Sequence, residues 1–530
     1  MTVQNSIPIV VGVTGHRNIR SGDRDALYRA VLSELSALKA RCPHSEIVML
    51  NSLAEGADTL CAEAANALSV PLIAALPMEP AEYEKDFSGE ALKTFRALCA
   101  GAEKCFVVPA AETPPDSFNR DFAYRQAGIY VAAHAHVLLA LWDGKETPAS
   151  NCGTAEAVKF ALDGAYEPVD GVPLGGFGAV LHVQTPREGS DSADAGTVRF
   201  LGDRAAFDGV LARTDEFNRL AAKTTAAGSL LPDTDREPDG MLDHLEALYT
   251  KADALSVRYA KQYRRILAAL AMISTVLTIA FLLYDEVELH WMILMCGVML
   301  LLAWLVQRVG NRFASHRRYL EYRMFAEGLR VQAFLRYAGS GLTASDVLPR
   351  SAQTETGWVA AALKVCAVGN APYPRHSIRA PWVEQQHAYH RRSVGRSERA
   401  HKGSERIVHA ALWISILLYL AVLAFELVWG GLLPVSRSIP NAGFYRTLSK
   451  LLLGSISAAT LFISNYYGRL SLSRTTADHA RMERFYAEIL NRIDRCGESD
   501  ALLTLIAREE LIENGNWCSY QRDNTADFNL

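Results

Sequence analysis

Small, polar and charged residues follow three of the predicted β-strands, and their types suit the binding of a phosphate group. Glycines let the backbone approach a ligand closely, hydroxyl and imidazole groups donate hydrogen bonds, and a guanidinium presents a planar fork of donors. The first group ends the apolar run IVVGVTGHR and consists of Gly12, Thr14, Gly15, His16 and Arg17. A Gly-x-x-Gly turn alone is as compatible with ordinary turn chemistry as with ligand binding.

The second group follows the next predicted strand, in the sequence NSLAEGADTL. It consists of Ser52, Glu55, Gly56 and Asp58. Asp58 stands where a helix is predicted to begin, and an aspartate at that place most often caps the helix N-terminus, which is the interpretation we favour. The alternative for Asp58 is a direct ligand contact.

The third group lies after the fifth predicted strand, in WDGKETPASNCGTAEAV, and consists of Asp143, Gly144, Gly153, Thr154 and Glu156. Gly153 and Thr154 begin a predicted helix whose free amides suit a nucleotide phosphate, and Glu156 is placed to face a sugar. The alternative is ordinary capping, with Thr154 as the N-cap and Glu156 favoured by the helix dipole. Because the carboxyl ends of parallel strands meet at one edge of a sheet, we expect the three groups to converge.

An α/β domain is needed to bring these groups together, and residues 1–187 have its pattern. Short apolar runs alternate with amphipathic segments, as in repeated βαβ units, which predicts a doubly wound parallel sheet. The predicted strands are 7–13, 46–53, 70–76, 104–108, 136–142 and 178–183. Residues 188–240 contain two stretches rich in Ser, Gly, Asp and Pro around a small helical segment, so we expect a linker there.

Length and composition limit the class of protein. The 530-residue chain exceeds the ~250 to 300 residues at which a single core stops growing, so several folded units are expected. A net charge of −4 gives no overall attraction to a nucleic acid polymer. The nine cysteines lack metal-ligand spacing, which indicates a reducing compartment and no metal site. The N-terminal residues lack the basic and apolar regions of a cleavable signal peptide.

Four apolar runs predict an all-α membrane domain with four transmembrane helices in two hairpins. Each run is long enough to cross ~30 Å of hydrocarbon, and they lie at about 266–284, 291–307, 409–429 and 451–467. The remaining chain is expected to form a first helical unit (241–345), a cytosolic helical connector (346–405) and a second helical unit with C-terminal cytosolic helices (406–530). Buried core helices of a soluble protein are the alternative, but they leave the basic flanks unexplained.

Basic residues flank both hairpins on the same side. Four precede the first hairpin within 258–265 and four follow it within 308–318, whereas the short connection 285–290 carries three acidic residues. The positive-inside rule then places both termini in the cytosol and residues 285–290 and 430–450 outside. The contrast is weaker for the second hairpin, whose outer loop contains Arg437, Arg446 and Lys450.

A short repeat follows the two hairpins: YRMFAEGLR (322–330) and ERFYAEILN (483–491). Arg323 and Glu327 of the first copy align with Arg484 and Glu488 of the second, four residues apart in each. Such a spacing predicts an intrahelical ion pair of ~0.3 kcal/mol on a solvated face. The alternative is packing between the two helical units.

Two features lie within the predicted spans. Glu426 stands near the outer end of the third span, where it is either a functional intramembrane carboxylate or a solvated interfacial residue. Gly454, Ser455, Ala458 and Ala459 in the fourth span have the spacing of small residues that allows close helix packing.

The order of the motifs GVTGHR, SLAEGAD, LPMEPAEYEKDF, YRQAGIYVAAHAHVLLALWDG and GTAEAV resembles the SLOG superfamily. The resemblance covers roughly residues 7–185 and implies a Rossmann-like domain that binds a nucleotide or a nucleotide-derived signal. About 250–523, with HRRYLEYRMFAEGLR after a hairpin and AREELIENGNWCSYQRDN at the end, resembles the SLATT-type membrane effector modules of bacterial conflict systems. Melastatin-type cation channels have a similar order of parts.

Enzymatic members of the superfamily, the cytokinin-activating phosphoribohydrolases, carry a PGG-x-GT-x-x-E loop. Residues 151–156 read NCGTAE, without Pro-Gly-Gly and with a shorter spacing to Glu156. The two resemblances imply a homo-oligomeric membrane effector for antiphage defence that senses a nucleotide-derived ligand in the inner membrane of a bacterium. The departure at residues 151–156 adds the expectation of no catalytic residue, and no cofactor is expected. One alternative is a membrane-tethered nucleotide N-glycosidic hydrolase with Glu156 and Asp143 as acid and base. Another is a scaffold that recruits partners.

Overall fold

The computed structural model of the chain divides into two compact units. Unit 1 comprises residues 1–255, 321–377 and 498–517, and unit 2 comprises residues 256–320, 378–497 and 518–530. The structure describes residues 6–145, 152–164, 178–187, 194–226, 228–231, 239–349, 353, 356–369, 373–428, 440–469 and 472–523.

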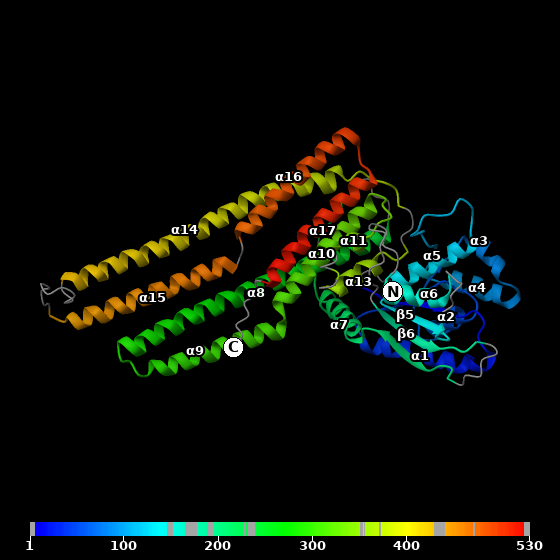
Figure 1. Cartoon of the computed structure of the whole chain (residues 1–530), viewed down its shortest axis with the longest axis horizontal. Helices are drawn as coiled ribbons and strands as arrows, with labels where there is room; N and C mark the ends of the chain where they lie inside the picture. The colour runs from blue at the N-terminus through cyan, green and yellow to red at the C-terminus, as the bar shows by residue number, and fades with distance from the viewer. Residues whose placement is uncertain are drawn as a thin grey trace. The chain divides into compact units, whose positions relative to one another are not determined.

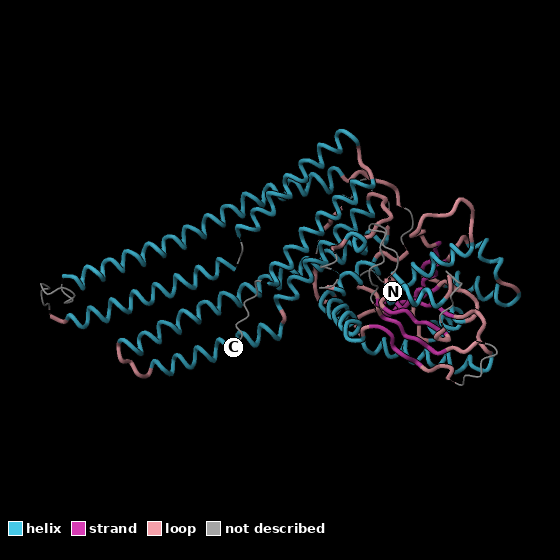
Figure 2. Tube along the Cα trace, in the orientation of Figure 1, coloured by secondary structure: helices cyan, strands magenta, loops and turns pink. Residues whose placement is uncertain are grey.

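Unit 1 contains a seven-stranded mixed sheet with the order β4-β3-β2-β1-β5-β6-β7 (Figure 2). Six strands are parallel: β1 (Ile9–Gly15), β2 (Ile47–Asn51), β3 (Leu72–Leu76), β4 (Lys104–Val107), β5 (Val137–Trp142) and β6 (Ala179–Gln184). They coincide, within one or two residues at each end, with the six strands expected from the sequence. On β1, Gly12 is paired with Leu50 of β2 and with Leu138 of β5.

The expectation of an entirely parallel sheet is wrong at one edge. β7 (Val198–Gly202) pairs antiparallel with β6 and lies within the residues assigned to the linker. A parallel neighbour would need a crossover connection of a dozen or more residues, usually a helix, whereas a short return gives an antiparallel pair. Arg199 of β7 is exposed and the apolar residues of this strand are only half-buried. Such an edge strand needs no continuous apolar run, so the sequence predicts it weakly.

Helices cover both faces of the sheet. Every residue of β2, β3 and β5 is buried, which is the pattern of strands packed on both sides. The helices of this part are α1 (Arg24–Arg41), α2 (Ala57–Ala67), α3 (Pro80–Tyr83), α4 (Gly89–Gly101), α5 (Arg120–Ala133), α6 (Thr154–Asp163) and α7 (Arg204–Ala221), with short 3₁₀ turns η1 (Ser21–Asp23) and η2 (Glu84–Asp86).

Further helices complete unit 1 around a buried aromatic cluster. Phe217 of α7 packs against Tyr322, Phe325 and Trp358, and the Trp358 indole donates to Glu321 at 3.1 Å. The burial of these four rings stabilises the packing of α7 against the later helices of the unit. Those helices are α10 (Ser315–Tyr337, from residue 321), α11 (Ala344–Val347), α13 (Gly357–Cys366) and most of α17 (Asp500–Asp523).

The C-terminal region is entirely helical in the part that the structure describes, and four of its long helices are apolar enough to cross a membrane (Figure 1). These are α8 (Gly240–Glu286), α9 (Met292–Phe313) continuing into α10, α14 (Gln385–Val428) preceded by the π-helical η3 (Arg379–Glu384), and α15 (Ala442–Arg469) followed by α16 (Leu472–Cys496). The predicted helix from residue 241 into the first span is confirmed, because α8 is unbroken and begins in unit 1 and ends in unit 2.

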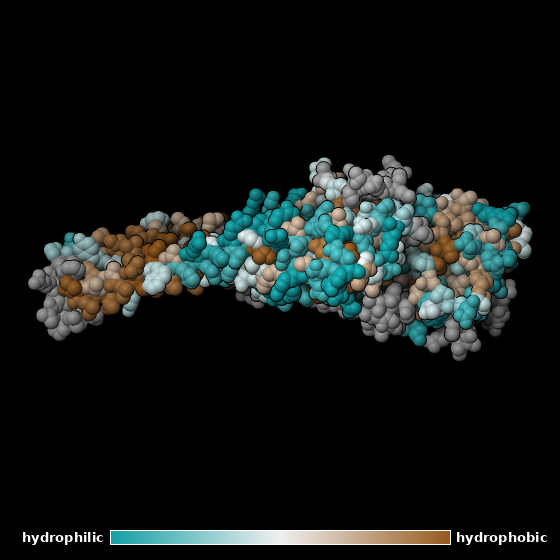
Figure 3. Space-filling model, turned by 90° about the horizontal axis from the view of Figure 1, so that it is seen from above, coloured by the Kyte–Doolittle hydropathy of each residue, from teal (hydrophilic) through white to brown (hydrophobic). Residues whose placement is uncertain are grey.

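Large apolar side chains on these helices are exposed on the protein surface. Leu294, Trp413 and Leu461 are 71%, 61% and 67% exposed, and Figure 3 shows apolar residues gathered along the long helices. Leaving such a side chain in water forgoes ~1.5 to 3 kcal/mol of burial free energy. A lipid environment removes that penalty, which indicates a membrane protein.

Ion pairs join the helices of unit 2 near the ends of the hairpins. Arg446 of α15 donates two hydrogen bonds to Glu426 of α14, at 2.8 and 2.9 Å, and Lys450 lies 3.0 Å from Glu286 of α8. One turn further along α15, a β-carbon on Gly454 would stand 2.8 Å from Leu282. Arg446, Lys450 and the small residue Gly454 therefore bring α15 into contact with α14 and α8.

The two copies of the sequence repeat differ in their ion pairs. In unit 1, Arg323 pairs with Glu327, as the spacing predicts, but Glu327 is buried, so the expectation of a solvated face is wrong for this copy. In unit 2, Glu488 pairs with Arg492 at 2.8 Å, and Arg484 donates to a backbone carbonyl instead. The predicted Arg–Glu pair is thus present in the first copy and wrong for the second.

Candidate ligand-binding site

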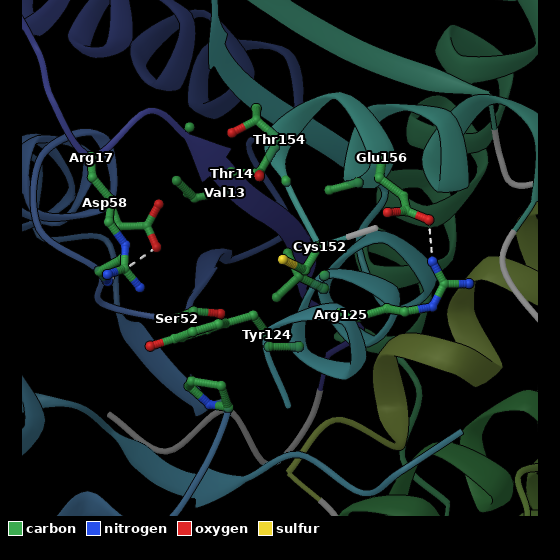
Figure 4. Close-up of a pocket in the computed structure, with 18 of the residues that line it drawn as sticks. Val13, Thr14, Arg17, Ser52, Asp58, Tyr124, Arg125, Cys152, Thr154 and Glu156 are labelled. Carbon is green, nitrogen blue, oxygen red and sulfur yellow. Dashed lines mark hydrogen bonds and ion pairs between the residues drawn. The ribbon is translucent and has the colours of Figure 1, made fainter. Parts of the chain in front are cut away.

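A cavity of about 440 Å³ opens at the carboxyl ends of the central strands of unit 1 (Figure 4). The strand order reverses between β1 and β5, and in open α/β sheets the turns after such strands leave a crevice for a ligand. Residues from all three predicted groups line it: Thr14, Gly15, His16, Arg17, Ser52, Asp58, Gly153, Thr154 and Glu156. Gly12, Glu55, Gly56, Asp143 and Gly144 are outside this lining.

Three of the predicted glycines serve packing between the turns. A β-carbon on Gly15 would lie 2.3 Å from the β-carbon of Ala57, and one on Gly12 would lie 2.8 Å from that of Ala135. Gly56 has φ +89° and lies against the backbone of Arg17. These contacts let α2 and the residues after α5 approach β1 and so position the cavity lining. Gly56 and Glu55 also line an adjoining cavity of about 310 Å³.

Gly144 adopts a turn conformation directly after β5. Its φ is +78°, a value that side-chain-bearing residues rarely adopt, and its neighbours are the side chains of His182 and Gln184. Gly144 therefore shapes the β5 turn rather than the cavity surface.

Arg17 lies on one side of the cavity, with its guanidinium 5.0 Å from the centre of the Tyr124 ring and 3.6 Å from the carboxylate of Asp86. Asp86 also receives hydrogen bonds from the Tyr124 hydroxyl and from Arg120. The ring and the carboxylate orient Arg17, whose side chain is 48% exposed. Its planar donors are therefore accessible to an anion in the cavity.

Asp58 is not the N-cap of α2, which contradicts the capping interpretation. The N-cap is Gly56, and Asp58 lies in the first turn, where it accepts a hydrogen bond from the backbone N–H of Ala54 at 3.2 Å. Asp58 is only 5% exposed. Burial raises its pKa to about 7, against the opposing effects of the Ala54 N–H and the positive charge of Arg17. A buried carboxyl group that changes charge near neutral pH thus lies in the cavity wall.

His16 and Asp143 form a connected pair at the ends of β1 and β5. His16 Nε2 accepts the backbone N–H of Asp143 at 3.2 Å, and the Asp143 carboxylate lies 3.0 Å from Arg187. Burial and the charge of Arg187 lower the pKa of His16, although Asp143 opposes them. The neutral form of the imidazole is therefore favoured, and its Nε2 also lies 3.3 Å from the carboxylate of Asp143.

The carboxyl group of Asp143 is ionised. Burial acts to raise its pKa, but the N–H of Lys145, the contact with His16 and the charge of Arg187 outweigh burial and lower it. An ionised carboxylate outside the cavity lining is poorly suited to donate a proton to a ligand there.

Glu156 lies on the side of the cavity opposite Arg17 (Figure 4). Arg125 of α5 donates to its carboxylate and also binds Glu112 at 2.8 and 3.0 Å. The second carboxylate oxygen of Glu156 is buried and has no hydrogen-bond partner among the residues that the structure describes. That oxygen can accept a hydrogen bond from a ligand hydroxyl.

The start of α6 and three hydroxyl groups supply donors. Gly153, not Thr154, is the N-cap of α6, so the predicted alternative in which Thr154 caps the helix is wrong. No side chain caps α6, so its first N–H groups suit an anion. Within the described segments, the hydroxyls of Thr14, Ser52 and Thr154 form no hydrogen bond with another residue.

The sequence did not predict several residues that line the cavity: Tyr83, Tyr124, Arg125, Cys152, Phe160 and Arg187. Arg187 follows β6. Residues after the sixth predicted strand are expected at the same edge of the sheet as those after the other strands, so the sequence could have identified Arg187. Tyr124 and Arg125 belong to the helical pattern of α5, and which face of α5 meets the cavity depends on its packing against α6. Asn151 of the NCGTAE motif lies outside the described residues.

No protein-family model matches the chain, and no curated protein shows significant similarity to it. Among the described residues, no group of three or more His, Cys, Asp or Glu side chains could hold a metal ion as they are arranged. The residues that line the cavity supply hydrogen-bond donors, carboxylates and aromatic rings.

Proposed function

We propose that the chain is a membrane effector in which the α/β part of unit 1 senses a nucleotide-derived ligand and changes the state of four membrane-spanning helices. The observation that carries this proposal is one cavity lined by Arg17, by the start of α6, which no side chain caps, and by an unpartnered oxygen of Glu156, in the same chain as four apolar helices. The strand order, which reverses between β1 and β5, supports a Rossmann-like, doubly wound fold, and we propose that this fold is of the SLOG type.

The ligand class follows from the cavity lining. Arg17 and the N-terminus of α6 suit a phosphate, and the rings of Tyr83, Tyr124 and Phe160 suit a planar base. The unpartnered oxygen of Glu156 suits a ribose hydroxyl. A volume of about 440 Å³ is within the range of small-molecule sites.

Helix α8 is the element through which a ligand would act. It begins in unit 1 and continues without a break into the first apolar segment. A ligand shifts such a protein only through different affinities for two conformations, and a coupling of ~1 to 3 kcal/mol is typical. We further propose that the protein is a homo-oligomer in a bacterial inner membrane, that it perturbs this membrane in antiphage defence, and that both termini are cytosolic.

The second candidate function is a membrane-tethered hydrolase of N-glycosidic bonds. It needs an acid and a base on either side of the scissile bond, with Glu156 and Asp143 as candidates. Glu156 is paired with Arg125, and Asp143 is ionised and outside the cavity lining. The geometry therefore favours binding over hydrolysis.

The first experiment identifies a ligand with the full-length protein in detergent. Adenine and guanine nucleosides and their mono-, di- and triphosphates are screened by thermal shift, and hits are measured by calorimetry. We expect nucleotides to stabilise the protein and the corresponding nucleosides to bind more weakly, because the phosphate contacts are lost. Equal binding of nucleosides and nucleotides, or no binding of either, contradicts the proposal.

The second experiment separates the effector from the hydrolase. Full-length protein in liposomes is expected to release an enclosed dye only when the stabilising nucleotide is present, and that nucleotide is expected to be recovered intact. Insertion of Gly-Gly-Pro after Ala254 breaks α8, because proline removes a backbone donor and clashes with the preceding turn. This variant should bind the nucleotide without releasing dye. Nucleotide breakdown that depends on Glu156, without dye release, supports the hydrolase instead.

A further inference from the structure

One face of α14 carries a row of basic side chains just before the apolar part of this helix. The row consists of Arg392, Arg396, Arg399, Lys402 and Arg406, all of them exposed, and we call it the basic stripe. Steps of four, three, three and four residues separate its members. Because an α-helix has 3.6 residues per turn, these steps keep all five on one side of α14.

A different face of α14 packs against the rest of unit 2. The buried residues of this helix are His390, Ser393 and Ser404, and His390 contacts His479 of α16. Helices α14 and α16 lie side by side (Figure 1). The basic stripe is therefore turned away from the packed face and is accessible to a partner.

Most charges of the basic stripe have no acidic neighbour. Among the described residues, Lys402 alone of the five contacts a carboxylate, that of Glu398 at 3.1 Å. Arg392, Arg396 and Arg399 donate instead to backbone or hydroxyl oxygens of α14 itself. Like charges three or four residues apart on a helix repel each other. An anionic partner would therefore stabilise this segment.

The same face of α14 becomes apolar directly after the basic stripe. Trp413, Leu417 and Leu420 follow Arg406 at steps of seven, four and three residues, and all three are exposed. Tryptophan is enriched at the boundary between the headgroups and the hydrocarbon of a membrane. Basic, aromatic and aliphatic side chains thus follow one another along this face in the order of the headgroup layer, the boundary and the hydrocarbon.

We propose that Arg406 and Lys402 bind the phosphate groups of anionic lipids at the bilayer surface that α14 enters. Arg406 precedes the apolar segment, which begins at residue 409, by three residues, and Lys402 precedes it by seven. These steps correspond to ~4.5 and ~10.5 Å along the helix. The headgroup layer is ~5 to 7 Å deep on each side, and long basic side chains extend toward it.

The ion pair of Lys402 does not prevent this contact. Lys402 and Glu398 are both exposed, and exposed pairs contribute little to stability, so a lipid phosphate can replace the carboxylate. The inference requires that α14 crosses a membrane and is independent of nucleotide binding by unit 1.

The distal end of the basic stripe distinguishes a lipid surface from other acidic partners. Arg392 precedes Arg406 by fourteen residues, which is ~21 Å along the helix. The potential of an anionic membrane falls off within a Debye length, ~8 to 10 Å at physiological ionic strength. A bilayer therefore attracts Arg406 far more than Arg392, whereas an acidic protein or a nucleic acid lying along α14 would contact both.

The test uses the full-length protein in a nonionic detergent, and its melting temperature is recorded as phosphatidylglycerol or phosphatidylcholine is added. We expect phosphatidylglycerol to raise the melting temperature more than phosphatidylcholine does, and high salt to reduce the difference. The amount of phosphatidylglycerol that gives half of the stabilisation should rise roughly fivefold in Arg406→Gln and in Lys402→Gln, the effect of one basic residue near an anionic surface.

Arg392→Gln is the matched control, because it removes the same charge from the same face. Its response to phosphatidylglycerol should stay within about twofold of wild type. All three variants should melt like wild type in phosphatidylcholine, since the positions are exposed and glutamine is a good helix former. If Arg406→Gln does not fold, Arg406→Ala and Arg406→Lys replace it, and only the lysine variant should keep the wild-type response.

Three results would overturn the proposal. The first is equal stabilisation of the wild-type protein by the two lipids. The second is an unchanged response to phosphatidylglycerol in folded variants of Arg406 and Lys402, which places the lipid contact elsewhere. The third is an equal loss of response in Arg392→Gln, which indicates a partner that lies along the whole basic stripe.

Discussion

A β-carbon on Gly56 would lie 2.0 Å from the carbonyl oxygen of Arg17. The turn after β2 is therefore in direct contact with the turn after β1, and the N–H of Ala57 donates to the carbonyl of His16 at 3.1 Å. Gly56 also has φ +89°, which side-chain-bearing residues rarely adopt. The position of Arg17 in the cavity thus depends on a glycine from a different strand end.

We expect Gly56→Ala to destabilise the protein by roughly 2 to 4 kcal/mol, because the substitution combines backbone strain with a steric clash. The melting temperature of the full-length protein in detergent measures the effect. Gly22→Ala is the control, since a β-carbon there meets no atom within 4 Å, and it should change the melting temperature little. Equal melting temperatures for the two variants would show that the β1 and β2 turns are not packed together as described.

Arg17→Ala and Thr154→Ala should weaken binding of the stabilising nucleotide to different extents. A charge-assisted hydrogen bond to phosphate contributes ~1.5 to 3 kcal/mol, so Arg17→Ala should lower the affinity more than about tenfold. Thr154→Ala removes a neutral hydrogen bond of ~0.5 to 1.5 kcal/mol. Calorimetry on the full-length protein provides the measurement, and Arg29→Ala, an exposed position on α1, is the control. Wild-type affinity in both variants would exclude Arg17 and the start of α6 as the phosphate site.

The stability of the protein should depend on pH through Asp58. Its pKa is raised from 3.8 to about 7 by burial, so the folded protein favours the neutral carboxyl group. The contribution of Asp58 to stability is therefore fully present below about pH 4 and is lost as the pH rises to about 7.

Asp58→Asn keeps the side chain neutral and should remove this dependence. We expect the variant to be more stable than wild type at pH 8, on the order of 2 kcal/mol, and the difference to shrink toward pH 5. Melting temperatures of both proteins across this range test the prediction. A constant difference at every pH would mean that the carboxyl group does not titrate in this window.

Reversing one charge of the Glu426–Arg446 pair should destabilise unit 2. Glu426→Arg places two like charges where two hydrogen bonds stood, and we expect a loss of about 1 kcal/mol because the pair is partly exposed. The double exchange, Glu426→Arg with Arg446→Glu, should recover most of that loss. Glu398→Arg beside Lys402, an exposed pair within α14, is the control and should have a smaller effect. Failure of the double exchange to recover stability would show that the ion pair is not the cause.

The topology can be tested with reporter fusions. We expect fusions after residues 235 and 523 to report the cytosol and a fusion within 430–439 to report the opposite side, because basic residues flank the hairpins on one side. A C-terminal fusion on the outer side would overturn the assignment.

Local sequence patterns alone predicted six of the seven strands and the four apolar helices. Residues 137–142 predict a buried strand and residues 266–284 predict a membrane span, because each is one continuous apolar stretch of the length that the element needs. The sequence likewise placed Thr14, Arg17, Ser52 and Thr154 at one edge of the sheet, because the carboxyl ends of parallel strands meet at the same edge.

The tertiary structure decided what depends on contacts between distant segments. The antiparallel β7, the face of α5 that carries Tyr124 and Arg125 to the cavity, and the buried environment of Asp58 arise from packing that no local window contains. His390 and His479 illustrate the reason most clearly: they are 89 residues apart in the chain, and only the antiparallel return of α16 along α14 brings their nitrogens to 3.1 Å. Periodicity predicts an element and its buried face, whereas the partner of that face is set by the free energy of the whole fold.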